Sequence, residues 1–429
     1  MAERTIPMPF GKGYLYIKIP ERNLQKVYSL NEPPNLMDEE KELEIRLKNP
    51  IQSKPVSALV GPQDKVCIIL SDITRPVPND RILTALLKEL RNISRKNITG
   101  VIATGLHRKN TKDELRSILG NHILNEIKVI NHDAFDNKKL RYIGKTSRGT
   151  ELFINKYVMN SDKIIMTGYI EPHEFAGFTG GRKSLLPGVS GADTINHNHS
   201  LENLDHPKAK IGILDGNPIH EDMVEAARIA GVDFIVNVVL DSKKRITNVV
   251  AGDVVEAHQA GVKFYTKYAE VDIGNLAEIV ITSSGYPLDI NLYQAVKSII
   301  AAEPFVTPGG IIILLAECNK GLGTDIFYSW MRSFSSPRDI INKLQEEGYR
   351  ADIDHCYFLA RILEKKNIVI VSAHPSMRKI RSPLIKVAYS TEEAIAYALN
   401  KKGRDASIAF LPHAQRIIPK IKSEQLKLL

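Results

Sequence analysis

The sequence has few of the features that mark secreted or membrane-spanning proteins. Its 429 residues include only three cysteines, Cys67, Cys318 and Cys356, which are far apart and odd in number. This pattern excludes a disulfide framework and a Cys-x-x-Cys metal site, and it fits a reducing cytosol. No apolar signal core follows the N-terminus, and no run approaches the roughly 18 apolar residues that a membrane span needs. We therefore expect a cytoplasmic protein that does not enter a membrane.

Two common nucleotide-binding signatures are also missing. A nicotinamide dehydrogenase would carry G-x-G-x-x-G after its first strand, but residues 71–76 read Ser-Asp-Ile-Thr-Arg-Pro. A Walker-type NTPase needs Gly immediately before its Lys, and here Arg182 precedes Lys183. The net charge of +9 fits a mildly basic surface or a site for carboxylates and phosphates. Because no nucleic-acid-binding signature is present, we expect no nucleic acid partner.

Short apolar runs bounded by turn residues are abundant, and they predict buried parallel strands. The first set of runs covers residues 66–70, 98–103, 163–167 and 234–240, and helical patterns at 80–90 and 220–230 lie between them. A second set covers residues 278–282, 310–315 and 368–372. This alternation predicts two α/β domains with mainly parallel sheets and an active-site cleft between them. We expect the first domain to span residues 1–272 and the second to span residues 273–429.

Polar residues follow several of these predicted strands, where ligands collect in open α/β sheets. Asp72, Thr74 and Arg75 follow the first strand, and His107 follows the second. Asp72 and Arg75 could form an ordinary turn with a surface charge. Alternatively, the planar fork of Arg75 could bind a carboxylate or phosphate, with Thr74 and nearby amides holding an anion.

The densest polar segment spans residues 171–184 and ends in Gly-Gly-Arg-Lys-Ser. Its glycines indicate that the backbone approaches something closely. Lys183 is then either an anion clamp or an amine available for covalent attachment. Downstream, His197 and His199 raise the expectation of a metal only modestly, and one of them could complete the shell of a metal held by a bound molecule. Gln294 and Lys297 would share one helix face, either solvated or directed at a carboxylate.

Taken together, these segments resemble the nickel-dependent lactate racemase family. The resemblance rests on motifs that run in order from about residue 70 to residue 300. They are Asp72–Pro76, Thr104–His107, His173–Lys183, Leu186–Gly188, Asn198–Ser200 and Gly285–Asp289 followed by Tyr293, Gln294 and Lys297.

This resemblance implies a cofactor and a set of residue roles. The cofactor is a nickel-pincer nucleotide, pyridinium-3-thioamide-5-thiocarboxylic acid mononucleotide, attached covalently to Lys183. Its sulfur and carbon atoms bind Ni, with His199 as the protein ligand. His107 and His173 correspond to the catalytic acid/base histidines. The remaining expected residues bind the cofactor (Asp72 and Thr74) or orient the substrate (Arg75, Gln294 and Lys297).

The chemistry explains why such residues are needed. The hydrogen on the C2 carbon of a 2-hydroxy acid is too weakly acidic for easy proton abstraction. Its removal as hydride gives a flat 2-keto acid, which can accept hydride on either face. A base must take the hydroxyl proton as hydride leaves, so two histidines on opposite sides serve the two enantiomers. A cationic carboxylate clamp holds the acid meanwhile.

One position departs from the family pattern and bears on the substrate. The family carries a Trp just ahead of a helix that resembles Leu359–Leu363, and Asp354 stands at that position here, whereas the single Trp of the chain is Trp330. A carboxylate there would accept hydrogen bonds from extra hydroxyl groups. We therefore expect Asp354 to bind the substrate, and the substrate to be more polar than lactate, for example a sugar acid such as gluconate.

Two alternatives stay open at this stage, namely a lactate racemase proper and a non-catalytic protein that binds nickel or anions. The binder explains the basic residues and histidines, but it does not explain two separate candidate bases. The expected partners are the small 2-hydroxy acid and the proteins that make the cofactor. A homo-oligomer is compatible with the sequence.

Overall fold

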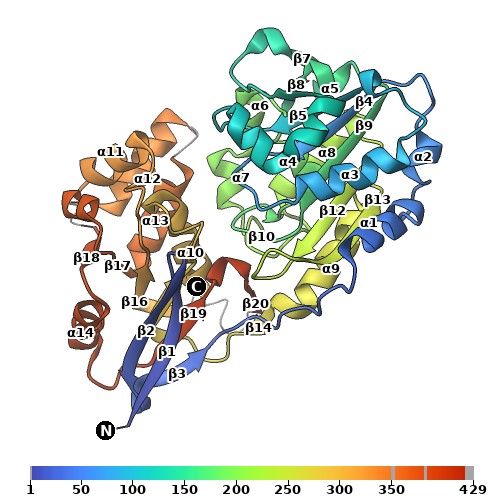
Figure 1. Ribbon diagram of the computed structural model, residues 1–429. Helices are drawn as coiled ribbons and strands as arrows, with labels where there is room; N and C mark the ends of the chain where they lie inside the picture. Colours follow the sequence, from blue (N-terminus) through green and yellow to red (C-terminus); the bar gives the residue numbers. More distant parts are fainter. Residues whose placement is uncertain (1, 349–352, 381–383, 421–429) are drawn as a thin grey trace. The chain divides into compact units, whose positions relative to one another are not determined.

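The chain forms two compact α/β units in the computed structural model, which describes residues 2–348, 353–380 and 384–420 (Figure 1). The central unit is Glu32–Tyr268. The terminal unit combines Met1–Asn31 with Ala269–Leu429. The predicted class of two α/β domains with mainly parallel sheets is confirmed.

The central unit is built on a six-stranded sheet with the strand order β13-β12-β9-β4-β5-β6. All neighbouring pairs are parallel except β12 and β13. The strands are β4 (Val66–Ser71), β5 (Ile98–Ala103), β6 (Lys128–Asn131), β9 (Lys163–Tyr169), β12 (Phe234–Leu240) and β13 (Ile246–Gly252). The four apolar runs predicted for this region coincide with β4, β5, β9 and β12.

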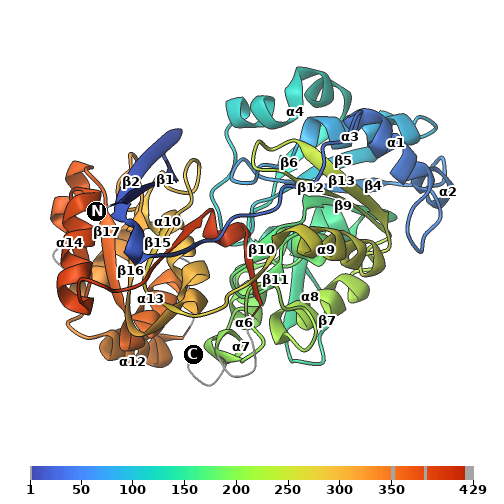
Figure 2. The same ribbon diagram turned by 90° about the horizontal axis from the view of Figure 1, so that it is seen from below.

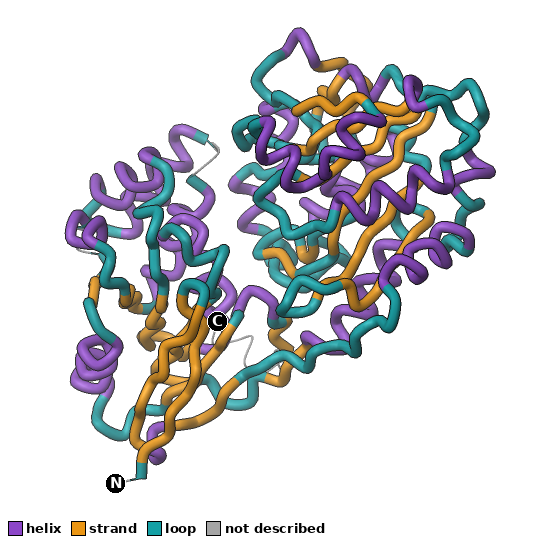
Figure 3. The backbone as a smooth tube through the Cα atoms, viewed as in Figure 1, coloured by secondary structure: helices purple, strands orange, loops and turns teal. Residues whose placement is uncertain are grey.

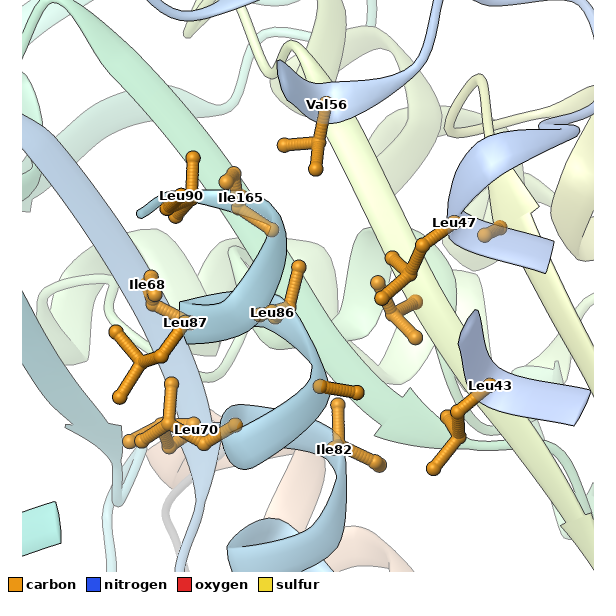
Figure 4. Packing of buried hydrophobic residues seen from close by; sticks show 14 of the residues in the cluster. Leu43, Leu47, Val56, Ile68, Leu70, Ile82, Leu86, Leu87, Leu90 and Ile165 are labelled. Atoms are coloured by element: carbon orange, nitrogen blue, oxygen red, sulfur yellow. The ribbon is translucent and has the colours of Figure 1, made fainter. Parts of the chain in front are cut away.

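Helices pack on this sheet because their apolar residues recur at helical spacing. In α3 (Asn79–Glu89), Ile82, Leu83, Leu86 and Leu87 are all buried. They meet alternate residues of β4, such as Ile68 and Leu70, and two leucines of α1 (Glu39–Lys48), as Figure 4 shows. α4 (Lys112–Glu126) starts at a capping box formed by Thr111 and Glu114. α8 (Pro218–Ile229) and α9 (Glu256–Ala269) complete the longer helices that the central unit contributes.

The terminal unit is built on a second six-stranded sheet with the order β18-β17-β16-β15-β19-β3, and all neighbouring pairs are parallel. Its strands are β3 (Leu24–Val27), β15 (Ala277–Ser283), β16 (Val306–Leu315), β17 (Asn367–Val371), β18 (Lys386–Ala388) and β19 (Ile408–Pro412). Its helices are α10 (Leu292–Ala302), α11 (Asp325–Ser333), α12 (Pro337–Glu347), α13 (Asp354–Lys365) and α14 (Thr391–Lys402).

The placement of residues 1–31 differs from the prediction. They belong to the terminal unit, whereas the sequence pattern assigned residues 1–272 to one domain. β3 pairs with β19, and the hairpin of β1 (Glu3–Phe10) and β2 (Gly13–Pro20) lies in the same unit (Figures 2 and 3). The hairpin packs its buried Ile6, Met8, Ile17 and Ile19 on the second sheet. These contacts span hundreds of residues, so no local pattern reveals them. The other boundary lies at residues 268/269, close to the expected 272.

Candidate active site

Three neighbouring strands of the central sheet bring four of the predicted site residues to one edge. β9, β4 and β5 lie side by side and run parallel, so their carboxyl ends meet at the same edge. Asp72 and Arg75 follow β4, and His107 follows β5. His173 follows β9 in the short strand β10 (Pro172–His173).

Asp72 and His107 form a hydrogen-bonded pair. Asp72 is buried, and its Oδ2 lies 2.8 Å from Nδ1 of His107. Its Oδ1 accepts a hydrogen bond of 2.7 Å from the Thr74 hydroxyl. Burial works to raise the pKa of the Asp72 carboxyl, but the hydrogen bond from His107 and the charges of His107 and Arg75 hold that pKa below its usual value. An ionised Asp72 favours the proton on Nδ1 of His107, so the lone pair of the neutral ring lies on Nε2.

Arg75 is half-buried among acidic side chains. Burial works to lower the pKa of its guanidinium, but the acidic groups around it outweigh burial and raise that pKa. They are Tyr169, Asp72, Glu174 and Glu171. Arg75 is therefore a fixed positive charge at the same strand ends as the Asp72–His107 pair. A planar cation of this kind suits a carboxylate.

His173 and Lys183 meet directly. Nζ of Lys183 lies 3.3 Å from Nε2 of His173 and 5.5 Å from the centre of the Phe175 ring. Phe175 packs edge-on against His173, with ring centres 4.6 Å apart. On its other side, His173 Nδ1 lies 3.4 Å from Oε2 of Glu174. The imidazole is thus held between an amine and a carboxylate in a buried position.

His199 joins the same cluster through Phe175, whose ring centre is 5.0 Å from its own. It is buried at the end of α6 (Ala192–Asn198), and its Nδ1 lies 3.1 Å from the carbonyl oxygen of Ile195. Burial lowers the pKa of His199 to about 3, and the charge of Lys183 acts in the same direction. A neutral imidazole whose Nδ1–H is bound to a carbonyl presents Nε2, as metal-binding histidines do. His197, the other candidate, is exposed, and its Nδ1 lies 2.9 Å from the Thr150 hydroxyl.

The backbone of the glycine-rich segment approaches other parts of the protein. Gly180 has a φ of 78°, and a Cβ there would lie 2.7 Å from Oδ1 of Asn237. The fully buried Arg182 ties this segment together, because its guanidinium donates to the carbonyl oxygens of Ala176 at 2.8 Å and of Gly180 at 3.2 Å. Burial lowers the pKa of Arg182 to about 9. The sequence pattern assigned no role to Arg182. Its guanidinium nevertheless joins the residue before Lys183 to Ala176, which lies three residues after His173.

A second residue that the sequence did not single out binds Asn198, the last residue of α6. Asp222 of α8 is fully buried and accepts hydrogen bonds from Thr146 at 2.5 Å, Thr150 at 2.7 Å and Asn198 at 2.7 Å. Asn198 immediately precedes His199. A lone Asp at helical spacing gives no sign of this network, because its three donors come from distant segments.

The other predicted residues belong to the terminal unit. Gln294 and Lys297 occupy half-buried positions of α10. Asp354 is the first residue of α13, and its Oδ1 accepts a hydrogen bond of 3.2 Å from the Tyr293 hydroxyl. Trp330 lies in α11. Whether Gln294, Lys297 and Asp354 act on one substrate with Arg75 stays a prediction.

Among the described residues 2–348, 353–380 and 384–420, no three His, Cys, Asp or Glu side chains form a group that could hold a metal ion. Within the same ranges, no helix has the length and apolar content needed to cross a membrane.

Comparison with known proteins identifies the family. Residues 10–212 match the lactate racemase N-terminal domain, and residues 273–418 match the lactate racemase C-terminal domain. The lactate racemase of Thermoanaerobacterium thermosaccharolyticum is 36% identical over 430 residues, which cover 97% of this chain and 100% of that protein. The lactate racemase of Lactiplantibacillus plantarum is 35% identical over 422 residues, with the same coverage.

Solved structures agree with this assignment. The lactate racemase apoprotein from Thermoanaerobacterium thermosaccharolyticum superposes with a TM-score of 0.91 at 34% identity, over 97% of this chain and 100% of that chain. A protein from Thermotoga maritima shares the fold, with a TM-score of 0.69 at 16% identity over 92% of this chain and 100% of its own. The chain belongs to the lactate racemase family and is an isomerase.

Proposed function

We propose that this protein inverts the C2 stereocentre of a 2-hydroxy acid by hydride transfer, with a nickel-pincer nucleotide bound covalently through Lys183. Lactate is the substrate that the names of the relatives support. The observation that carries the proposal is the position of the Lys183 amine, 3.3 Å from Nε2 of His173 and next to the Phe175 ring that also contacts His199. An attachment point, a candidate base and a candidate metal ligand therefore lie in one cluster.

The residues of this cluster fit such a cofactor. When bound, the nucleotide supplies the hydride acceptor, and the protein supplies orientation and proton transfer. His199 is neutral and presents Nε2 as a metal ligand, because its Nδ1 is bound to the carbonyl of Ile195. Nζ of Lys183 lies 5.5 Å from the centre of the Phe175 ring in a half-buried position, where its amine could be joined to the cofactor.

His107 and His173 supply the two bases that racemisation needs. As hydride leaves C2 of one enantiomer, one imidazole takes the hydroxyl proton, and the other returns a proton when hydride adds to the opposite face of the 2-keto acid. Asp72 keeps the proton of a neutral His107 on Nδ1, which leaves Nε2 to receive the substrate proton. This proposal gives Asp72 a role in orienting His107, in addition to the cofactor contact expected for Asp72 and Thr74.

The substrate carboxylate would be held by cations and amide donors. Arg75 is a fixed charge beside the Asp72–His107 pair, and Gln294 and Lys297 offer further donors from α10. A second candidate substrate, a polyhydroxy acid such as gluconate, is favoured by Asp354. Its carboxylate and the Tyr293 hydroxyl form a polar pair at the start of α13 that suits extra hydroxyl groups.

Intact mass and racemisation, measured on the same preparation, test the proposal. The protein is produced together with the cofactor-making proteins, and wild type is compared with Lys183→Ala and with Lys210→Ala, which removes an exposed lysine. We expect Lys183→Ala to lose both the mass adduct and turnover, and Lys210→Ala to lose neither. His107→Ala and His173→Ala should keep the adduct and lose turnover.

Two results would redirect the interpretation. An unmodified wild-type protein that binds nickel without turnover would support the non-catalytic binder. A panel containing both enantiomers of lactate and the C2 epimers of gluconate decides between the two candidate substrates, because the enzyme should show the higher kcat/KM for its own substrate class.

A further inference from the structure

The tip of the N-terminal hairpin is hydrogen-bonded to the loop that follows β15. The backbone N–H of Gly11 donates to Oδ2 of Asp289 at 2.6 Å, and the N–H of Tyr286 donates to the carbonyl oxygen of Gly11 at 2.8 Å. The hydroxyl of Ser283 donates to the carbonyl oxygen of Pro9. The segment Gly285–Asp289, which the sequence pattern marked as a strand-end motif, thus receives residues from the other end of the chain.

Asp289 links this hairpin tip to a third segment. Its Oδ2 also lies 3.4 Å from the backbone N–H of Glu317, and its carbonyl oxygen accepts a hydrogen bond of 2.8 Å from the N–H of Cys318. Asp289 is fully buried, and its Oδ1 has no hydrogen-bond partner among the described residues. Backbone amides are therefore its main hydrogen-bond donors, and the shortest of these bonds comes from Gly11.

The same loops hold the first turn of α10. The N–H groups of Leu292 and Tyr293 donate to the carbonyl oxygens of Gly321 and Leu322, each at 3.1 Å. The N–H of Lys320 donates to the carbonyl oxygen of Ile290 at 2.7 Å. A shift of Asp289 would therefore move the start of α10 together with the residues that α10 carries.

We propose that the hairpin tip and Asp289 form a latch that positions Gln294 and Lys297 for the substrate carboxylate. Asp289 and Gly11 are then positioning residues for substrate binding. The inference rests on the proposed function, in which Gln294 and Lys297 bind that carboxylate. It gives the tip of the N-terminal hairpin, at Gly11, a role in substrate binding.

The backbone of the hairpin tip and that of the loop after β15 come close to neighbouring residues at two glycines. Gly11 has a φ of 53°, and a Cβ there would lie 2.6 Å from Oε2 of Glu317. Gly285 has a φ of 66°, and a Cβ there would lie 2.8 Å from Cβ of Pro9. Buried residues of the hairpin, such as Met8 and Ile17, also pack on the sheet. We therefore expect the hairpin to stay in place when only the hydrogen bond between Gly11 and Asp289 is removed.

The test uses the full-length enzyme carrying its Lys183 adduct. Asp289→Ala removes the acceptor, and Gly11→Val places a β-branched residue at a positive φ that it rarely adopts. Asp289→Asn keeps one acceptor oxygen and should be intermediate. The matched control is Gly13→Ala, because a Cβ at Gly13 meets no atom within 4 Å.

We expect Asp289→Ala and Gly11→Val to raise the KM for the 2-hydroxy acid about tenfold, as for the loss of one hydrogen bond to a charged group. The adduct mass should stay unchanged, kcat should stay within about twofold, and Gly13→Ala should match wild type. A lowered melting temperature with unchanged KM in the folded enzyme would overturn the latch, since it would then be merely structural. If Asp289→Ala does not fold, Asp289→Asn decides by the same criterion.

A binding measurement separates this inference from the proposed function. Calorimetric titration with lactate reports affinity whether or not the enzyme turns over. If wild type binds lactate without racemising it and the latch variants bind it about tenfold more weakly, the proposed function fails and the latch stands. If wild type racemises lactate and the variants bind it as tightly as wild type does, the latch fails and the proposed function stands. If wild type neither racemises nor binds a 2-hydroxy acid, both fail.

Discussion

Replacing Asp72 by Asn is the sharpest single test of how His107 works. The change keeps the size of the side chain but turns a carboxylate that accepts from Nδ1 of His107, at 2.8 Å, into an amide that can donate. An amide donor would favour the proton on Nε2, so His107 could no longer accept the substrate proton there. In a serine protease, the equivalent change of the carboxylate beside histidine lowers kcat about 10⁴-fold.

We expect a smaller loss in this protein. The His107 side chain is 44% exposed, so water can compete for its nitrogen and rotate it into a productive state. The hydrogen bond itself, between a carboxylate and a ring N–H, corresponds to about 1.5–3 kcal/mol. That range alone gives roughly a 10- to 150-fold loss. Because the amide would also shift the His107 proton to Nε2, we expect kcat/KM to fall about 100-fold or more.

The assay follows racemisation from each enantiomer together with the mass of the Lys183 adduct. Two enantiomers have an equilibrium constant of one, so kcat/KM must fall equally in both directions. In a single turnover, however, 2-keto acid should form slowly only from the enantiomer whose hydroxyl proton goes to His107. The control Thr74→Val removes only the 2.7 Å hydrogen bond to Oδ1 of Asp72, and its loss should stay below about tenfold. Loss of the adduct with normal turnover per loaded enzyme would refute the orienting role and support a cofactor contact for Asp72.

Three further outcomes follow from the same structure. His199→Ala should keep the Lys183 adduct but retain at least about tenfold less nickel by elemental analysis, and nickel retained at the wild-type level would remove His199 as the ligand. Arg182→Met leaves the carbonyl oxygens that Arg182 binds without their donor, so we expect the free energy of unfolding in urea to fall by about 2 kcal/mol, and an unchanged midpoint would contradict this. Burial lowers the pKa of His132 to about 4, so the unfolded chain takes up its proton first as pH falls. The contribution of His132 to the free energy of unfolding should be complete above about pH 6.5 and should fall by about 1–3 kcal/mol towards pH 4. A His132→Asn variant whose free energy of unfolding depends on pH as in wild type would contradict this.

Much of the fold follows from local sequence patterns. The apolar runs at residues 66–70, 98–103 and 234–240 coincide with β4, β5 and β12, because a strand buried on both faces must be continuously apolar. The spacing of leucines in α3 likewise reports its buried face. These signals depend only on neighbours along the chain.

The candidate site was also visible in part. The ordering of motifs placed Asp72, His107, His173 and Lys183 on loops that parallel strands bring to one edge. The sequence could not say which of these residues bind one another. That Asp72 holds His107, and that Lys183 meets His173, depends on the register and spacing of β9, β4 and β5.

Other features were decided by tertiary structure alone. The hairpin of β1 and β2 packs on a sheet whose strands other than β3 lie more than 200 residues later, and Gly11 binds Asp289. Asp222 gathers donors from segments up to 76 residues away, and the charge of Arg182 is buried among carbonyl oxygens. Each is a contact between segments whose own patterns are ordinary. The sequence by itself therefore determined the elements, their order and the chemically active residue types, because these depend on local periodicity and side-chain chemistry. Folding decided the partners, because a buried polar group takes whichever donor or acceptor the packed chain brings to it.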